Sequence, residues 1–160
     1  MKKGALVLIL LIAIFMVGCG KTDVKNSNEP QTMESEKDSD TETRDWDDYM
    51  TSVKEKSDRI KVSLENDELT QTEMNIKSQE LYELWDGALN DMWSELKRSL
   101  SEEEFSKMQD EQHAWIAEKE KSVGEVGKEV EGGSMYSLIV NMEAAKITEE
   151  RVYELYELLK

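Results

Sequence analysis

The sequence has one cysteine, one proline and one histidine among its 160 residues. With Cys19 as the only thiol, an internal disulfide and the cysteine-based zinc sites are excluded. With His113 as the only histidine, there is no histidine cluster and no Ser-His-Asp order, and the sequence also lacks a glycine-rich phosphate loop. We therefore expect a protein that is not an enzyme and needs no cofactor or metal. His113, beside Glu111 and Gln112, is expected to be a surface residue.

The N-terminus has the pattern of a bacterial lipoprotein signal. Lys2 and Lys3 precede the uncharged apolar residues 5–17, a stretch too short to span a bilayer, which needs about 20 residues. Residues 16–19, MVGC, resemble a lipobox, with methionine where leucine is usual. We expect cleavage before Cys19, lipidation of that cysteine, and attachment to the extracytoplasmic face of the cell membrane. The alternative is an ordinary secretory signal with an unrelated cysteine.

Positive charge is scarce, with 20 Lys and Arg against 36 Asp and Glu. Loss of Lys2 and Lys3 with the signal would leave 18 against 36, a formal charge of −18. Such a chain would repel phosphates, so we expect no binding to nucleic acid. The negative charge would suit a cationic partner, although solubility at a crowded surface explains it as well.

Residues 20–44 are rich in Lys, Asn, Ser, Thr, Glu and Asp, and include the only proline, Pro30. This composition, without hydrophobic periodicity, predicts a disordered tether with a root-mean-square reach of roughly 25–30 Å. We divide the chain into a signal peptide (1–18), a lipidated cysteine with a linker (19–44) and a helical domain (45–160). The domain is long enough to bury one core without disulfides.

From residue 45 onward, apolar residues recur at three- and four-residue steps, which indicates amphipathic helices. The apolar runs extend over 46–64, 74–100, 105–130, 135–142 and 152–159. This pattern predicts an all-α fold, a small antiparallel helical bundle. The expected form has two long antiparallel helices, the first run packed beside them, and a shorter C-terminal pair.

Local signals mark where these helices begin and end. Thr70 with Glu73, and Ser101 with Glu104, form two capping boxes. Gly132 and Gly133 are expected to end the third helix. After them, we expect the side chains of two further residues, Ser134 and Thr148, to cap the two short C-terminal helices.

Five short segments resemble, in order, the motifs of the lysozyme inhibitor LprI-like family. They are TQTEMN at 70–75, WDGALN at 85–90, QHAWI at 112–116, GGSM at 132–135 and ITEERVYEL at 147–155. The resemblance extends over about 90 residues, 69–158, and leaves out 46–66. It implies export, a helical fold and, for some members, inhibition of lysozyme.

The sequence departs from that family at its cysteines. Family members typically carry them where this chain has Lys77, Val123 and Glu143. The family disulfides are therefore absent, which fits a Gram-positive exported protein. The domain must then be held together by helix packing alone.

Several polar or aromatic residues of the matched segments are expected to have structural roles, because such residues in bundles usually make hydrogen bonds between helices or at helix ends. They are Asn75, Asp86, Asn90, Gln112, Trp115, Thr148 and Arg151. We predict in particular an Asp86–Arg151 pair.

Two of the four tryptophans are candidates for partner binding. Trp85 and Trp115 lie on apolar stripes and are expected to pack in the core. Trp93 lies off the main stripe and Trp46 starts a helix, so both are expected to be partly exposed.

The turn at Gly132, Gly133 and Ser134 is a further candidate, because a short polar loop could enter the cleft of a lysozyme. A plain helix–helix turn is the simpler interpretation of these three residues.

Two functions from different classes fit these features. The first is a surface-anchored binding module that inhibits a cationic hydrolase of the lysozyme type. The second is a structural or sensing lipoprotein that holds another envelope protein through a helical face. A contiguous exposed apolar patch with Trp93 or Trp46 would favour the second, whereas a uniformly acidic surface would favour the first.

Overall fold

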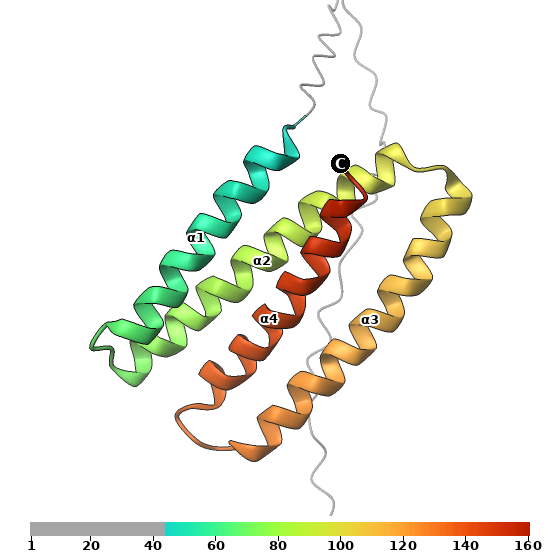
Figure 1. The fold of residues 1–160 in the computed structure, drawn as a ribbon. Helices are drawn as coiled ribbons and strands as arrows, with labels where there is room; N and C mark the ends of the chain where they lie inside the picture. The colour runs from blue at the N-terminus through green and yellow to red at the C-terminus, as the bar shows by residue number, and fades with distance from the viewer. Residues whose placement is uncertain (1–43) are drawn as a thin grey trace, which may run out of the picture. The chain divides into compact units, whose positions relative to one another are not determined.

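The computed structural model describes residues 44–160, and in this range it contains four α-helices and no strand (Figure 1). The helices are α1 (Trp46–Asn66), α2 (Gln71–Ser99), α3 (Glu102–Glu129) and α4 (Tyr136–Glu157). The predicted all-α bundle is confirmed. The predicted signal peptide, Cys19 and the linker up to residue 43 lie outside the described residues.

Helix α2 packs most extensively on α4, while α1 lies against α2 and α3 lies against α4 (Figure 1). The expectation that the two long helices, α2 and α3, form the main pair is therefore wrong. Small side chains favour this pairing: Ala88 of α2 and Ala145 of α4 both lie in the buried core cluster, where they leave room for close approach of the helices. Between α2 and α3, bulky rings such as Trp93 and Phe105 meet instead, with centroids 5.2 Å apart.

The C-terminal pair of short helices is a single continuous helix, α4. Thr148 does not cap a helix, because it is fully buried within α4 and its hydroxyl donates to the carbonyl of Ala144 at 2.7 Å. Hydroxyls in helix interiors commonly make this backward bond. Ser134 does not cap α4 either, since the N-cap position is Met135 and no side chain caps it. No glycine or proline follows Gly133, so nothing in the sequence interrupts the helix.

Both predicted capping boxes are confirmed. Thr70 accepts a hydrogen bond from the backbone of Glu73, and Ser101 accepts one from the backbone of Glu104. Each glutamate carboxylate accepts in return from the backbone N–H and the hydroxyl of its partner. These reciprocal bonds satisfy N–H groups that the first turns of α2 and α3 would otherwise leave unpaired.

The core is centred on Trp85 of α2, which is fully buried as expected. Its indole Nε1 donates to the hydroxyl of Ser57 at 3.1 Å, and Ser57 on α1 is fully buried as well. This bond joins α1 to α2 and satisfies the one polar group of the ring. Aliphatic and methionine side chains complete the fully buried core around it: Leu81, Met92, Leu96, Val152 and Leu155.

Replacing Trp85 with alanine should lower the free energy of unfolding by about 3–5 kcal/mol, because the change leaves a large cavity and an unpaired Ser57 hydroxyl. Urea denaturation followed by circular dichroism measures this loss. Trp46→Ala, at a half-buried tryptophan, is the matched control and should cost clearly less. Equal losses for the two variants would contradict the central place of Trp85.

Hydrogen bonds from Thr70 lower the pKa of the Glu73 carboxyl below its ordinary value of 4.5. The Glu73 carboxyl thus has a lower pKa in the folded chain than in the unfolded chain. The capping box therefore stabilises the fold at pH values above the pKa of the unfolded chain, and this stabilisation is lost as the pH falls through the pKa of the folded chain. Thr70→Val, which removes the hydroxyl, should raise the pKa of Glu73 toward 4.5 in an NMR titration. Glu104, lowered by Ser101, is the internal control and should not move. An unchanged Glu73 would contradict the role of Thr70.

Candidate functional site

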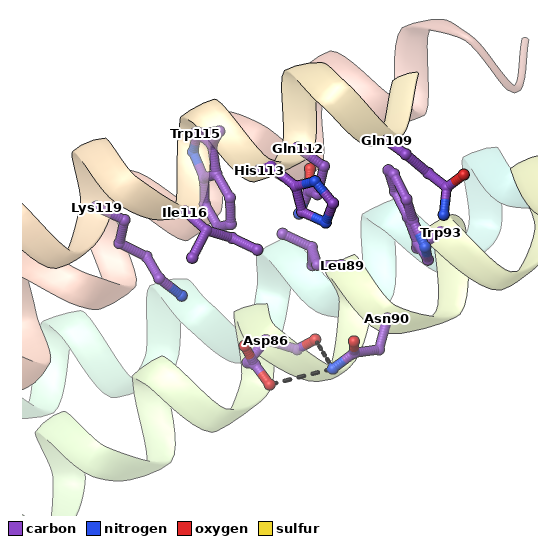
Figure 2. A pocket seen from close by; sticks show the side chains of 10 residues that line it. All are labelled: Asp86, Leu89, Asn90, Trp93, Gln109, Gln112, His113, Trp115, Ile116 and Lys119. Carbon is purple, nitrogen blue, oxygen red and sulfur yellow. Dashed lines mark hydrogen bonds between the residues drawn. The ribbon is translucent and has the colours of Figure 1, made fainter. Parts of the chain in front are cut away.

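A groove between α2 and α3 brings together residues of two matched segments (Figure 2). Its volume is about 330 Å³. The lining residues recur at helical spacing on the two facing surfaces: Asp86, Leu89, Asn90 and Trp93 on α2, and Gln109, Gln112, His113, Trp115, Ile116 and Lys119 on α3. Four residues that the sequence analysis assigned to structure, Asp86, Asn90, Gln112 and Trp115, thus face one hollow.

Arg151 of α4 contacts this groove from behind, through Gln112. Its Nε donates to the Gln112 side-chain oxygen at 3.0 Å, and one of its Nη atoms donates to Glu154 at 2.6 Å. Arg151 is only 8% exposed, and its Nη2 has no hydrogen-bond partner within residues 44–160. The guanidinium therefore holds Gln112 in one orientation.

The predicted Asp86–Arg151 pair is wrong. Arg151 lies on the part of α4 that meets α3, so Gln112 is its partner across the helices. The Asp86 carboxylate instead accepts from Asn90 at 3.1 Å, one turn along α2, and from the Tyr82 hydroxyl at 3.4 Å. Asp86 is thereby held in place at the edge of the groove (Figure 2).

The orientation of the Gln112 amide leaves a hydrogen-bond donor for the groove. A guanidinium only donates, so the amide oxygen must face Arg151 and the NH₂ group must point away from it. Within the described residues, that NH₂ group donates no hydrogen bond, and Gln112 lines the pocket. The groove therefore offers a donor from Gln112 and acceptors from Asp86.

The aromatic walls of the groove come from Trp93 and Trp115, both half-buried. Trp115 packs against the core, as expected, while part of its surface lines the groove. The ammonium of Lys119 lies 4.8 Å from the Trp115 ring centre and 5.3 Å from that of Tyr82. Burial lowers the pKa of Lys119, and the nearby Asp86 carboxylate partly opposes this shift. His113 is exposed at the groove, as the sequence predicts.

Trp46, the other predicted binding tryptophan, lies at the start of α1 and does not line the groove. It is half-buried and packs edge-on against Tyr49, with ring centres 5.4 Å apart. The guanidinium of Arg44 lies within about 5 Å of both rings. The structure therefore does not bring Trp46 and Trp93 together.

The predicted glycine turn connects α3 to α4 and is held in one conformation. Gly132 has a φ of 76°, in the left-handed region that favours glycine. The backbone N–H of Gly133 donates to the carbonyl of Val130 at 3.0 Å. Asn75, in the first matched segment, donates from its side chain to the carbonyl of Ser134 at 3.2 Å. The first and fourth matched segments thus meet at this turn.

The glycine turn lies at the same end of the bundle as the α1–α2 connection, opposite the end where residue 44 lies (Figure 1). We call this end, formed by residues 62–76 and 130–136, the distal end. It carries four of the seven exposed large hydrophobic side chains of the described residues. These four are Val62, Ile76, Met135 and Tyr136.

Sequence reasoning missed Met135 because it starts an amphipathic segment after the glycines and was counted among the apolar residues of that segment. It did not single out Tyr136. Met135 and Tyr136 are 46% and 44% exposed. It also missed Lys119 in the groove. Its spacing of four residues from Trp115 could have indicated that the two side chains meet.

Residues 44–160 contain no cluster of three or more metal-binding side chains. None of the four helices in this range is both long and apolar enough to cross a membrane.

A family model described as lysozyme inhibitor LprI matches residues 63–155. The chain belongs to the LprI lysozyme inhibitor family. The matched range includes the groove, the glycine turn and all of α2 and α3. No curated protein and no solved structure matches the chain.

Gln112→Leu should lower the free energy of unfolding by about 1.5–3 kcal/mol, because it removes a hydrogen bond to the buried Arg151 guanidinium. Gln109→Leu, one turn earlier on α3 at an exposed position, is the matched control and should change stability by less than about 0.5 kcal/mol. Chemical denaturation of both variants checks this. If Gln112→Leu were as stable as the control, Arg151 would not depend on Gln112.

Proposed function

We propose that this chain is an inhibitor of lysozyme, held at the cell envelope. The observation that carries the proposal is membership of the LprI lysozyme inhibitor family over residues 63–155. The same range contains the glycine turn with its exposed neighbours. The inhibitory contact would then be made by the folded helical domain and not by the linker.

The charge of the domain supports a basic enzyme as the partner. Residues 44–160 carry 15 Lys and Arg against 29 Asp and Glu, a net charge of −14. Lysozymes are commonly basic. Opposite net charges accelerate association and make it sensitive to ionic strength.

The distal end supplies the features that a tight protein contact needs. Met135 and Tyr136 offer an exposed methionine and an aromatic ring, residue types that are enriched in interfaces. Exposed carboxylates lie in the same connections, at Asp67, Glu68 and Glu131. Because the turn is already held by the hydrogen bonds of Gly133 to Val130 and of Asn75 to Ser134, little conformational entropy would be lost on binding. We propose that this end enters the lysozyme cleft.

Lipidation of Cys19 would attach the protein to the extracytoplasmic face of the membrane. The linker would join the domain at residue 44, which lies at the end of the bundle opposite the glycine turn. Helix α2 alone has 29 residues, which corresponds to a length of about 43 Å. The proposed anchor would therefore be connected to the domain at the end opposite the distal end.

The alternative, a lipoprotein that holds another envelope protein through a helical face, requires an exposed apolar patch around Trp93 or Trp46. Both side chains are half-buried, and neither belongs to the exposed large hydrophobics. No feature of the described residues favours this alternative over lysozyme binding.

The purified full chain, in mild detergent, should inhibit lysozyme in a cell-wall lysis assay at micromolar concentration, and inhibition should weaken as salt is raised. The double variant Met135→Ser/Tyr136→Ser should weaken inhibition at least about tenfold, because it removes the proposed apolar anchors. Leu158→Ser, at a side chain that is 60% exposed at the opposite end, is the matched control and should inhibit normally.

Undiminished lysozyme activity at low and at moderate salt would contradict the proposed function. Full inhibition by the double variant would contradict the distal end as the contact.

A further inference from the structure

We infer that the groove between α2 and α3 is a separate binding site for an N-acetylated hexosamine unit of a glycan. The groove shares no lining residue with Met135 and Tyr136 at the distal end. This inference therefore does not depend on the proposed lysozyme contact.

The charges of the groove favour a neutral ligand. Asp86 and Lys119 contribute one charge of each sign, and they interact with each other. An anionic ligand would also meet the net charge of −14 on residues 44–160. A cationic ligand would meet the Lys119 ammonium, which already lies over the Trp115 ring.

The polar groups match those of an acetamido sugar. An acetamido group has one carbonyl that accepts a hydrogen bond, one N–H that donates and one methyl group. The Gln112 NH₂ group can donate to the carbonyl, and the Asp86 carboxylate can accept from the N–H. Leu89 and Ile116 provide apolar surface between the groove walls for the methyl group (Figure 2).

The aromatic walls suit the body of a sugar ring. A pyranose has faces of C–H groups and edges of hydroxyl groups, so it packs its faces on aromatic rings while its edges make hydrogen bonds. Trp93 and Trp115 lie toward opposite ends of the groove, with Leu89 between them (Figure 2). A volume of about 330 Å³ is at the small end of ligand sites and suits one or two sugar rings.

Arg151 acts as a positioning residue in this site. It does not line the groove, but its bond to the Gln112 oxygen turns the amide NH₂ group away from the core. Its burial at 8% exposure makes this orientation hard to reverse, because a flipped amide would present a donor to a donor.

The four tryptophans allow a direct test by NMR. Chitotriose, the trimer of N-acetylglucosamine, is added at millimolar concentration to the ¹⁵N-labelled full chain in mild detergent, without lysozyme. The indole N–H signals of Trp93 and Trp115 should shift, while those of the buried Trp85 and of Trp46 should not. Absence of any shift, or a shift confined to Trp46, would overturn the inference.

Variants and a second sugar sharpen the test. Trp115→Ala and Asp86→Asn should each weaken chitotriose binding about tenfold or more, whereas Trp46→Ala should bind as the unaltered chain does. Asp86→Asn keeps the side-chain size, so it remains informative if Trp115→Ala unfolds. Unaltered binding by Asp86→Asn would overturn the role of the carboxylate. Cellotriose, which lacks acetamido groups, should bind at least about tenfold more weakly, and equal binding would overturn the acetamido assignment.

A soluble peptidoglycan fragment distinguishes the source of the glycan. Stronger binding of this fragment than of chitotriose would support the site with cell-wall glycan as its source. Stronger binding of chitotriose would support it with a chitin-type glycan as the source. The distal-end variant Met135→Ser/Tyr136→Ser should bind chitotriose as the unaltered chain does, so that failure of one site is distinguishable from failure of the other.

Discussion

The close packing of α2 on α4 is the constraint on which the rest of the domain depends. The small side chains of Ala88 and Ala145 permit this approach, and no disulfide within the described residues supplements it. Trp85 then fixes α1 to the same pair through Ser57. Helix α3 is held against α4, while large aromatic side chains separate it from α2. The groove is a direct consequence of this arrangement, because its two walls belong to helices that do not pack closely.

The segments that carry the family resemblance gather at two places in the fold. Asn75 and the glycine turn meet at the distal end, where Met135 and Tyr136 are exposed. Asp86 and Gln112 both line the groove, and Arg151 of α4 bonds to Gln112. This separation leaves the proposed lysozyme contact at one end of the domain and the groove along its side.

Local signals predicted the helices well, because capping and periodicity depend on neighbours in the sequence. The boxes at Thr70 and Ser101 mark the starts of α2 and α3 correctly. The cap predicted at Thr148 was wrong because a threonine hydroxyl can cap a helix or bond backward within one. Only its burial in the folded bundle decides between the two. Periodicity also shows which face is apolar but not which helix covers it. The α2–α4 pairing, the Arg151–Gln112 bond and the groove between α2 and α3 therefore could not be predicted.

The most direct test of the account is hydrogen–deuterium exchange of the full chain with and without lysozyme. Exchange should be slower at residues 130–136 and 71–76 when lysozyme is present, since these segments belong to the proposed contact at the distal end. Exchange along the first half of α1, near residue 44, should be unaffected. Protection confined to that half of α1, or no protection anywhere at saturating lysozyme, would contradict the account.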